Sequence, residues 1–194
     1  TVDANGAATA RMADLQCTLS LVDETKHDKN KPDHTNNKTK ALAKVATGIP
    51  FLDHMIEQLH SHAQMRPAVV LAHANTTFAP NTHYATQCSD MDHQTADAHI
   101  LRLVGTCLGA ALRRHLDGAS AASARFLCPL DEALAEARLT RDTGAAFELD
   151  YEQAPFGRFP AGGRTRVGDL QLELLPLFWN AVTEQLGGRL CIRK

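Results

Sequence analysis

The sequence has few aromatic residues, no basic excess and no long apolar run, and each absence excludes a class of protein. Only 5% of the 194 residues are aromatic, and almost none stand among the Lys and Arg positions, where a nucleic-acid surface would need them. The formal net charge of -2 favours neither sign, so we expect no nucleic-acid partner. No stretch approaches the ~18 consecutive apolar residues that span a bilayer, so we predict a chain that does not cross a membrane.

Cysteine is scarce and irregularly spaced. The five cysteines are an odd number and form no Cys-x-x-Cys pair: Cys17, Cys88, Cys107, Cys128 and Cys191. This pattern argues against a disulfide framework and favours a reducing compartment. Residues 1–10 resemble the small-residue tail left when a presequence is removed, although trimming of the chain explains them equally well. We therefore expect the interior of an organelle, a mitochondrion before a plastid, or otherwise the cytoplasm.

The overall amino-acid composition predicts a folded domain. Apolar residues make up 44% of the chain and charged residues 22%, which is typical of globular proteins. A length of 194 residues fits one domain, or two fused half-domains. The polar insertion 23–40 contains no apolar residue and cannot offset the entropy of ordering it, so we predict an exposed loop. His27 and His34 lie in this loop without neighbouring cysteines, and we interpret them as solvated side chains.

Hydrophobic periodicity predicts strands that alternate with helices, and hence an α/β fold. Residues 13–22 alternate as a half-buried strand does, and Ala68–Ala72 resembles a short buried strand. A helix is predicted from Thr47 to His62, with Pro50 in its first turn. A second helix is predicted over 94–116. The apolar stripes of these two helices are Leu52, Met55, Ile56 and Leu59, and Leu101, Val104, Leu108, Ala111 and Leu112.

The second half of the chain repeats part of the first. We predict a helical segment at Asp131–Ala137, then a strand that contains Phe147, Leu149 and Tyr151, then a loop over 155–166. A glycine, a helix and a strand recur at nearly the same spacing, and Pro176 should kink the second helix or delay its start. The repeated features are Gly48 and Gly168, the helices that follow each glycine, and strands ending near Val69 and at Arg189–Ile192.

The two halves are predicted at about 10–118 and about 123–194. In the first half a long helix follows the repeated strand, whereas the second half reaches Lys194 without one. We therefore predict that the second repeat is incomplete. A partner chain should then pack against the surface beside Arg189–Ile192 and the Leu172–Leu186 helix, unless the second sheet is narrower and the loop 155–166 folds over it.

Possible metal ligands concentrate in two places, at Asp53-His54 and in the run 90–99. His93 and Asp97 are four residues apart, so on a helix they share a face where an imidazole and a carboxylate can meet one ion. The alternative is that Asp90 and Asp92 cap a helix and that the histidines are polar surface. One His-x-x-x-Asp spacing leaves both interpretations open.

Four segments, TGIPFLDHM, DHQTAD, CPLDEALAEA and VGDLQLELLPLFWNAV, occur in an order that resembles the imidazoleglycerol-phosphate dehydratase family. The resemblance runs from about Ala10 to Arg193, with foreign insertions at 23–40 and 73–89. It implies an α/β (α+β) fold of duplicated half-domains, each a four-stranded sheet backed by helices, of the ribosomal protein S5 domain 2-like type. It also implies trimers assembled into a 24-subunit shell, and a hydro-lyase of histidine biosynthesis that uses two manganese ions to dehydrate imidazole glycerol phosphate to imidazole acetol phosphate.

Few of the metal ligands of the family are retained in this sequence. The resemblance places His54 on a metal ligand and His93 on the first His of a His-His-x-x-Glu motif. The second His of that motif becomes Gln94, its Glu becomes Asp97, and a later His ligand becomes Cys191. The amide of glutamine is a poor substitute for imidazole. The metal ligands implied by resemblance are therefore His54, His93 and Asp97.

The substrate contacts of the family are also unevenly matched. Arg125 matches an Arg that contacts the substrate phosphate, but the Arg of the Ser-Gly-Arg-Pro motif falls on Ala145. An acidic contact of the family near the first strand has no secure counterpart. A second His-His-x-x-Glu motif and a Ser-x-Lys clamp would fall beyond Lys194.

A transition-metal ion needs about four to six donors and a two-ion site roughly twice as many, so this set predicts no catalysis of the family type. We expect a non-catalytic relative that serves as a structural subunit, with other protein subunits as partners and without a cofactor. The enzyme alternative is an active manganese-dependent dehydratase. A third alternative is a binding module that keeps one metal ion at His54, His93 and Asp97.

Overall fold

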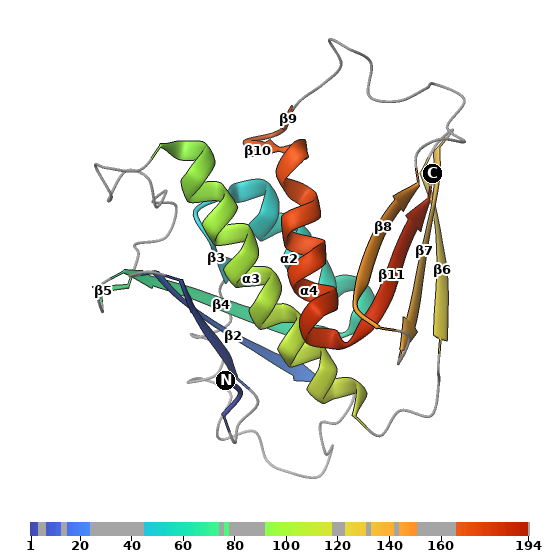
Figure 1. Ribbon diagram of the computed structural model, residues 1–194, viewed down its shortest axis with the longest axis horizontal. Helices are drawn as coiled ribbons and strands as arrows, with labels where there is room; N and C mark the ends of the chain where they lie inside the picture. Colours follow the sequence, from blue (N-terminus) through green and yellow to red (C-terminus); the bar gives the residue numbers. More distant parts are fainter. Residues whose placement is uncertain are drawn as a thin grey trace.

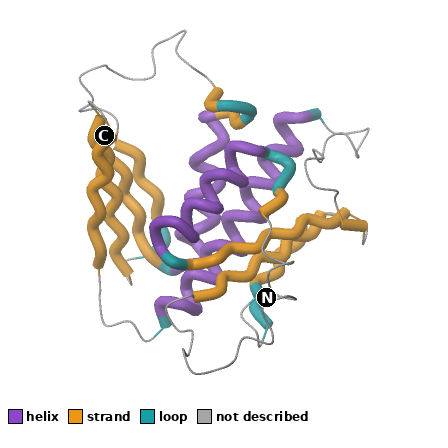
Figure 2. The backbone as a smooth tube through the Cα atoms, turned by 180° about the vertical axis from the view of Figure 1, so that it is seen from behind, coloured by secondary structure: helices purple, strands orange, loops and turns teal. Residues whose placement is uncertain are grey.

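The protein has two β-sheets with helices between them, as Figure 1 and, from behind, Figure 2 show. A computed structural model describes 1–3, 7–12, 15–23, 45–73, 76–77, 92–117, 123–130, 133–141, 144–150 and 166–193. Most of the predicted polar insertion, and the predicted loop 155–166 except for Arg166, lie outside the described residues. Of the helices that the structure describes, none has the length and apolar content to cross a membrane.

The first sheet has the strand order β1-β2-β4-β3, with β5 added to the end of β4. Strands β1, β2 and β4 pair antiparallel, and β3 pairs parallel to β4. Buried apolar side chains at alternate positions of β2 explain the strand, since one face of the sheet turns to the helices. The bounds are β1 Ala8–Met12, β2 Leu15–Asp23, β3 Val45–Ala46, β4 Met65–His73 and β5 Thr76–Thr77.

The second sheet has the order β6-β7-β11-β8, in which β8 alone pairs parallel, to β11. Each strand therefore has a counterpart of the same direction in the first sheet, which confirms the predicted duplication. The bounds are β6 Ser123–Leu130, β7 Ala133–Arg141, β8 Ala146–Asp150 and β11 Gly188–Arg193. A small separate hairpin joins β9 Arg166–Val167 to β10 Leu170–Gln171.

The helices are α2 Pro50–Ala63, α3 His93–Leu116 and α4 Leu175–Leu186, with a 3₁₀ turn η3 Leu172–Leu174 before α4. Both repeated helices have a proline in the first turn, where its missing N–H costs no hydrogen bond. Pro176 therefore delays the start of α4, as the sequence predicts. Gly48 and Gly168, which precede the repeated helices, both have positive φ angles, of 80° and 59°. The structure confirms the glycine-helix-strand repeat.

Helix α3 is the centre of the core, because it packs against β1 and β2 on one side and against α4 on the other. Its contact with α4 is close at two glycines. A Cβ atom on Gly105 would lie 2.5 Å from the carbonyl oxygen of Phe178, and one on Gly109 would lie 2.3 Å from that of Val182. Only glycine permits this approach, so α3 and α4 hold the two halves of the molecule together.

One sequence prediction is wrong in the structure. Asp131–Ala137, predicted as helical, contains the beginning of strand β7, because Ala133, Ala135 and Ala137 alternate with larger side chains and the segment pairs with both β6 and β11. Tertiary pairing overrides the helix propensity of Ala, Leu and Glu. Residues 8–10 of the small-residue segment belong to β1 and pair with β2.

Candidate functional site

The first predicted metal ligand, His54, is exposed on α2. The carboxylate of its neighbour Asp53 faces the chain before the helix, where its Oδ1 accepts hydrogen bonds from the Thr47 N–H at 2.8 Å and the Thr47 hydroxyl at 2.6 Å. Thr47 itself is buried, with 1% of its surface exposed. Asp53 therefore fixes the entry to α2, which is a structural role, while the imidazole of His54 lies on the surface.

The other predicted ligands lie in the first two turns of α3. Asp92 caps the helix, because its carboxylate accepts from the N–H and the hydroxyl of Thr95 at 2.9 and 2.7 Å. These hydrogen bonds from Thr95 lower the pKa of the Asp92 carboxyl below its ordinary value. His93 is exposed, whereas Asp97, four residues later, is only 2% exposed. Although the spacing places them on one side of the helix, Asp97 is covered by the core and His93 lies beyond it.

Gln94, at the position of the second His in the resemblance, makes a contact of its own. Its amide Nε2 donates to Oε1 of Glu173 at 2.7 Å, which connects the start of α3 to the 3₁₀ turn η3 before α4. A nearby contact also crosses between the halves, where the Phe51 N–H donates to Oδ1 of Asp169 at 3.1 Å. Gln94 and Asp169 therefore join the ends of helices from the two halves.

Within the part of the chain that the structure describes, no three His, Cys, Asp or Glu side chains gather closely enough to hold a metal ion. His54, His93 and Asp97 lie on two helices, and Cys191 lies on β11 of the second sheet. The described residues of this chain therefore do not fit a two-manganese centre by themselves.

Arg125 and Cys191 lie on the same face of the second sheet, the face turned away from the helices. Cross-strand pairs share a face, so the pairing of Arg125 with Arg138, and of Arg138 with Cys191, puts all three on this side. We call it the polar face. It carries the side chains Arg125, Glu136, Arg138, Thr140, Glu148, Arg189, Cys191 and Arg193.

Two ion pairs lie on the polar face. Nη2 of Arg125 donates to Oε2 of Glu136 at 2.7 Å, and Arg189 pairs with Glu148. The hydrogen bond from Arg125 lowers the pKa of the Glu136 carboxyl, with Arg193 and Arg138 adding to the effect. The described side chains of this face include four arginines and two glutamates. A hollow of about 250 Å³ lies among these side chains, with Cys191 in its lining.

The sequence prediction missed the arginines beside Arg125, for an identifiable reason. Glu136, Arg138 and Thr140 occupy alternate positions, as do Arg189, Cys191 and Arg193, and this spacing places each set on one side of a strand. The prediction of a helix at Asp131–Ala137 hid the first set. A strand assignment there would have put Glu136 and Arg138 beside Arg125.

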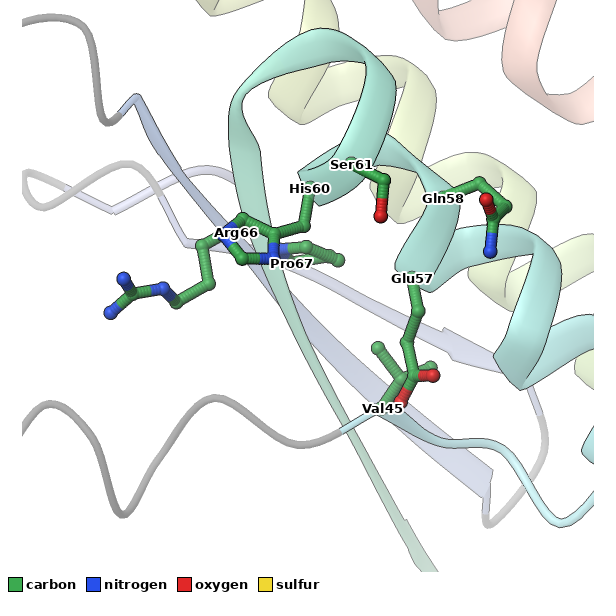
Figure 3. A pocket seen from close by; sticks show the side chains of 7 residues that line it. All are labelled: Val45, Glu57, Gln58, His60, Ser61, Arg66 and Pro67. Atoms are coloured by element: carbon green, nitrogen blue, oxygen red, sulfur yellow. The ribbon is translucent and has the colours of Figure 1, made fainter.

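A second hollow, of about 460 Å³, lies where α2 ends and β4 begins. Glu57, Gln58, His60 and Ser61 come from α2, and Figure 3 shows the guanidinium of Arg66 pointing away from the other labelled side chains. None of the predicted site residues lines this hollow, and its polar groups have mixed charge. The polar face is therefore the better candidate site, because it contains Arg125.

Comparison with known proteins gives two kinds of relative. The bifunctional histidine-biosynthesis protein HisB of Stenotrophomonas maltophilia (strain K279a) is 29% identical over 178 residues, which are 91% of this chain and 42% of that protein. The imidazoleglycerol-phosphate dehydratase of Prochlorococcus marinus (strain MIT 9211) is 31% identical over 157 residues, 80% of this chain and 62% of that protein. The chain spans less than two thirds of the length of either relative.

Solved structures agree on the fold. Imidazoleglycerol-phosphate dehydratase from Staphylococcus aureus superimposes with a TM-score of 0.58 at 16% identity, covering 96% of this chain and 82% of that one. The enzyme from Pyrococcus furiosus, in complex with (S)-C348, gives a TM-score of 0.62 at 14% identity, with 95% and 77% covered. The family model named imidazoleglycerol-phosphate dehydratase matches residues 47–194. With most of its length matched in this way, the chain belongs to the imidazoleglycerol-phosphate dehydratase family.

Proposed function

We propose that the chain is a non-catalytic member of this family that serves as a structural subunit of a larger protein assembly. One observation carries the proposal: strands β6 and β7 expose large apolar side chains. Phe126, on the face towards the helices, is 68% exposed, and Leu127 and Leu134, on the polar face, are 44% and 50% exposed. Phe126 is the exposed large apolar side chain on the face that a helix would cover, so this face of β6 and β7 is the expected contact with another chain.

The first sheet shows which kind of element packs on the corresponding strands. There α3 packs against β1 and β2, the counterparts of β6 and β7. In the second sheet α4 packs against β8 and β11, where Phe147 stacks on Trp179 with ring centroids 6.1 Å apart. Among the described residues, no helix takes the place of α3 over β6 and β7 (Figure 1). An amphipathic helix of a partner chain fits this position.

The incomplete ligand set supports the lack of catalysis. Gln94 donates a hydrogen bond to Glu173, and the Asp97 side chain is buried. Neither side chain is therefore placed to share a metal ion with the exposed His93. Metal affinity falls with the number and quality of donors. Manganese bound after dialysis should therefore stay well below two ions per chain. Elemental analysis that finds two ions per chain would contradict the proposal.

The decisive assay is turnover of imidazole glycerol phosphate with added manganese. We expect none from the purified chain, with the dehydratase of Prochlorococcus marinus as the positive control in the same buffer. Turnover that disappears in His93→Ala would overturn the non-catalytic assignment.

The partner is tested by replacing one exposed apolar residue. Phe126→Asp should abolish recovery of the partner chain in a purification under native conditions. Val70→Asp, an exposed apolar position of the first sheet, is the matched control and should leave recovery intact. Equal recovery with both variants, or a stable monomer by light scattering with this face free, contradicts the structural role.

A second candidate function is an active manganese-dependent dehydratase, and the polar face favours it. Four arginines with Arg125 among them suit a phosphorylated substrate, because guanidinium groups bind phosphate with paired hydrogen bonds. Under this alternative Arg125→Ala raises the KM for imidazole glycerol phosphate. The non-catalytic assignment predicts that there is no turnover to alter.

A further inference from the structure

Two buried cysteines from distant parts of the chain lie in contact beneath α3. Cys17 on β2 and Cys107 on α3 are 90 residues apart, and their exposed fractions are 0% and 1%. Sγ of Cys107 donates to the carbonyl oxygen of Cys17 at 3.4 Å. The contact therefore brings two reduced sulfur atoms to one point between the helix and the sheet.

A hollow gives small molecules a route towards this pair. Its volume is about 630 Å³, and it lies between β1 and α3, where Thr9, Ala10, Thr106 and Ala110 line it together with Cys107. Cys17 is not among the lining residues. A small solute that enters the hollow therefore meets Cys107 first, with Cys17 directly behind it.

The two thiols differ in acidity. The hydrogen bond from Cys17 lowers the pKa of Cys107, assisted by a backbone hydrogen bond at Ala10, and these effects outweigh the burial of Cys107. The same contact, together with burial, raises the pKa of Cys17 well above its ordinary value. A thiolate is the nucleophilic form of cysteine, and Cys107 is the one of the two sulfur atoms that the hollow reaches.

We propose that Cys107 is a peroxide-reactive thiol and that Cys17 resolves its oxidised form, so that a disulfide closes between α3 and β2. The sulfur of Cys107 attacks one oxygen of hydrogen peroxide, the O–O bond breaks, and Cys107 becomes a sulfenic acid while the other oxygen leaves as water. The thiol of Cys17 then attacks the sulfenic sulfur, the S–O bond breaks, and a second water is released. Peroxide is reduced and the two thiols are oxidised.

The pair belongs to the first half alone. The strand pairing places Ala137 of β7 at the position that corresponds to Cys17, so the second sheet has no equivalent. Cys128 on β6 is exposed and Cys191 lines the hollow of the polar face, and neither has a described cysteine as its cross-strand neighbour. Oxidation to an intramolecular disulfide is therefore expected at Cys17 and Cys107, whether or not the chain is catalytic.

The test uses the full chain with Cys88, Cys128 and Cys191 replaced by Ser, which leaves the two buried thiols. Native protein treated with a slight excess of hydrogen peroxide should lose the mass of two hydrogen atoms. Peptide mapping should recover a Cys17–Cys107 crosslink, and dithiothreitol should reverse both changes. Two thiols that stay reduced until the protein unfolds would overturn the proposal.

Trapping separates the two roles. In Cys17→Ala the sulfenic acid on Cys107 has no resolving partner, so dimedone should label it, whereas Cys107→Ala should leave Cys17 unlabelled. The thermal unfolding midpoint of the unsubstituted chain should rise on oxidation, because the crosslink restricts the unfolded state. This measurement of the unfolding midpoint uses the unsubstituted chain, so no core substitution can affect its folding. Labelling of Cys17 in place of Cys107, or an unchanged midpoint after crosslinking, would contradict the assignment.

Discussion

Corresponding rows of the two sheets are buried to very different degrees. In the first sheet, one row across the four strands is no more than 5% exposed at any position: Ala8, Leu19, Val69 and Val45. In the second sheet, the matching row has its first residue exposed and the other three half-buried: Ala124, Leu139, Leu190 and Phe147. Strand order and apolar pattern are the same, so neither of them decides burial.

The difference lies in which helices reach each sheet. Helix α3 covers β1 and β2, where the corresponding positions hold small or medium side chains such as Ala10 and Cys17. In the second sheet the position of Ala10 is taken by Phe126, and α4 packs against the other two strands. A sheet face is stabilised only by what packs on it, and the second sheet has this support on half of its width.

The largest contrast should come from a matched pair of leucines. Leu19→Ala, at a fully buried position, should lower the free energy of unfolding by about 2–5 kcal/mol, because it leaves a cavity in a closed core. Leu139→Ala, at the corresponding half-buried position, should cost less than half as much. Urea unfolding of both variants measures the difference. Equal losses would show that the second sheet is as well covered as the first.

The next effect tests the joint between the halves. Gly109→Ala should lower the free energy of unfolding by about 1–3 kcal/mol, since the new Cβ would lie 2.3 Å from the carbonyl oxygen of Val182. Alanine is otherwise the better helix former by about 1 kcal/mol, so any loss reports the clash. Asn180→Ala, on an exposed position of α4, is the control and should be close to neutral. Stabilisation by Gly109→Ala would mean that the helices separate easily.

Removal of the exposed phenylalanine should have little effect on folding. Phe126→Ala should change the free energy of unfolding by no more than about 0.5 kcal/mol in the isolated chain, because the ring is 68% exposed. Phe178→Ala, at a side chain only 5% exposed, should cost about 3–5 kcal/mol. A large loss with Phe126→Ala would indicate that the ring is already covered.

The smallest effect concerns the ion pair of the polar face. Folding lowers the pKa of Glu136, so the pair stabilises the protein above the unfolded pKa, and the stabilisation is lost as pH falls through the lower folded pKa. Arg125→Ala should therefore be slightly less stable than the unsubstituted chain at pH 7 and equal to it in acid. Salt should shrink the difference, because both groups are exposed to solvent screening. A difference that persists in acid would point to packing of the Arg125 stem.

Local patterns determined much of the fold. Helix α2 has Pro50 in its first turn, as predicted, although it begins at Pro50 and not at Thr47. The spacing of Gly48 and Gly168 revealed the duplication that both sheets display. Helix α3 was predicted within one residue at its start. These features depend on backbone preferences and apolar periodicity within a few turns, which the sequence carries directly.

The candidate site could be predicted only in part. Arg125 lies on the polar face together with Cys191. The helix predicted at 131–137 hid the pairing of β7 with both β6 and β11, which brings Arg138 beside both residues. The metal ligands stay predictions at His54, His93 and Asp97. These residues lie on two helices, and only the side chain of Asp97 is buried.

By itself the sequence determined the kinds of element, their order and the repeat, because these follow from contacts between near neighbours along the chain. Only the tertiary structure decided that β7 is a strand, that Cys17 meets Cys107 across 90 residues, and that Phe126 is exposed where Ala10 is not. Each of these depends on which distant segment packs against the residue. Residue type and spacing do not specify that partner, since the same apolar alternation fits a covered sheet and an open one equally well.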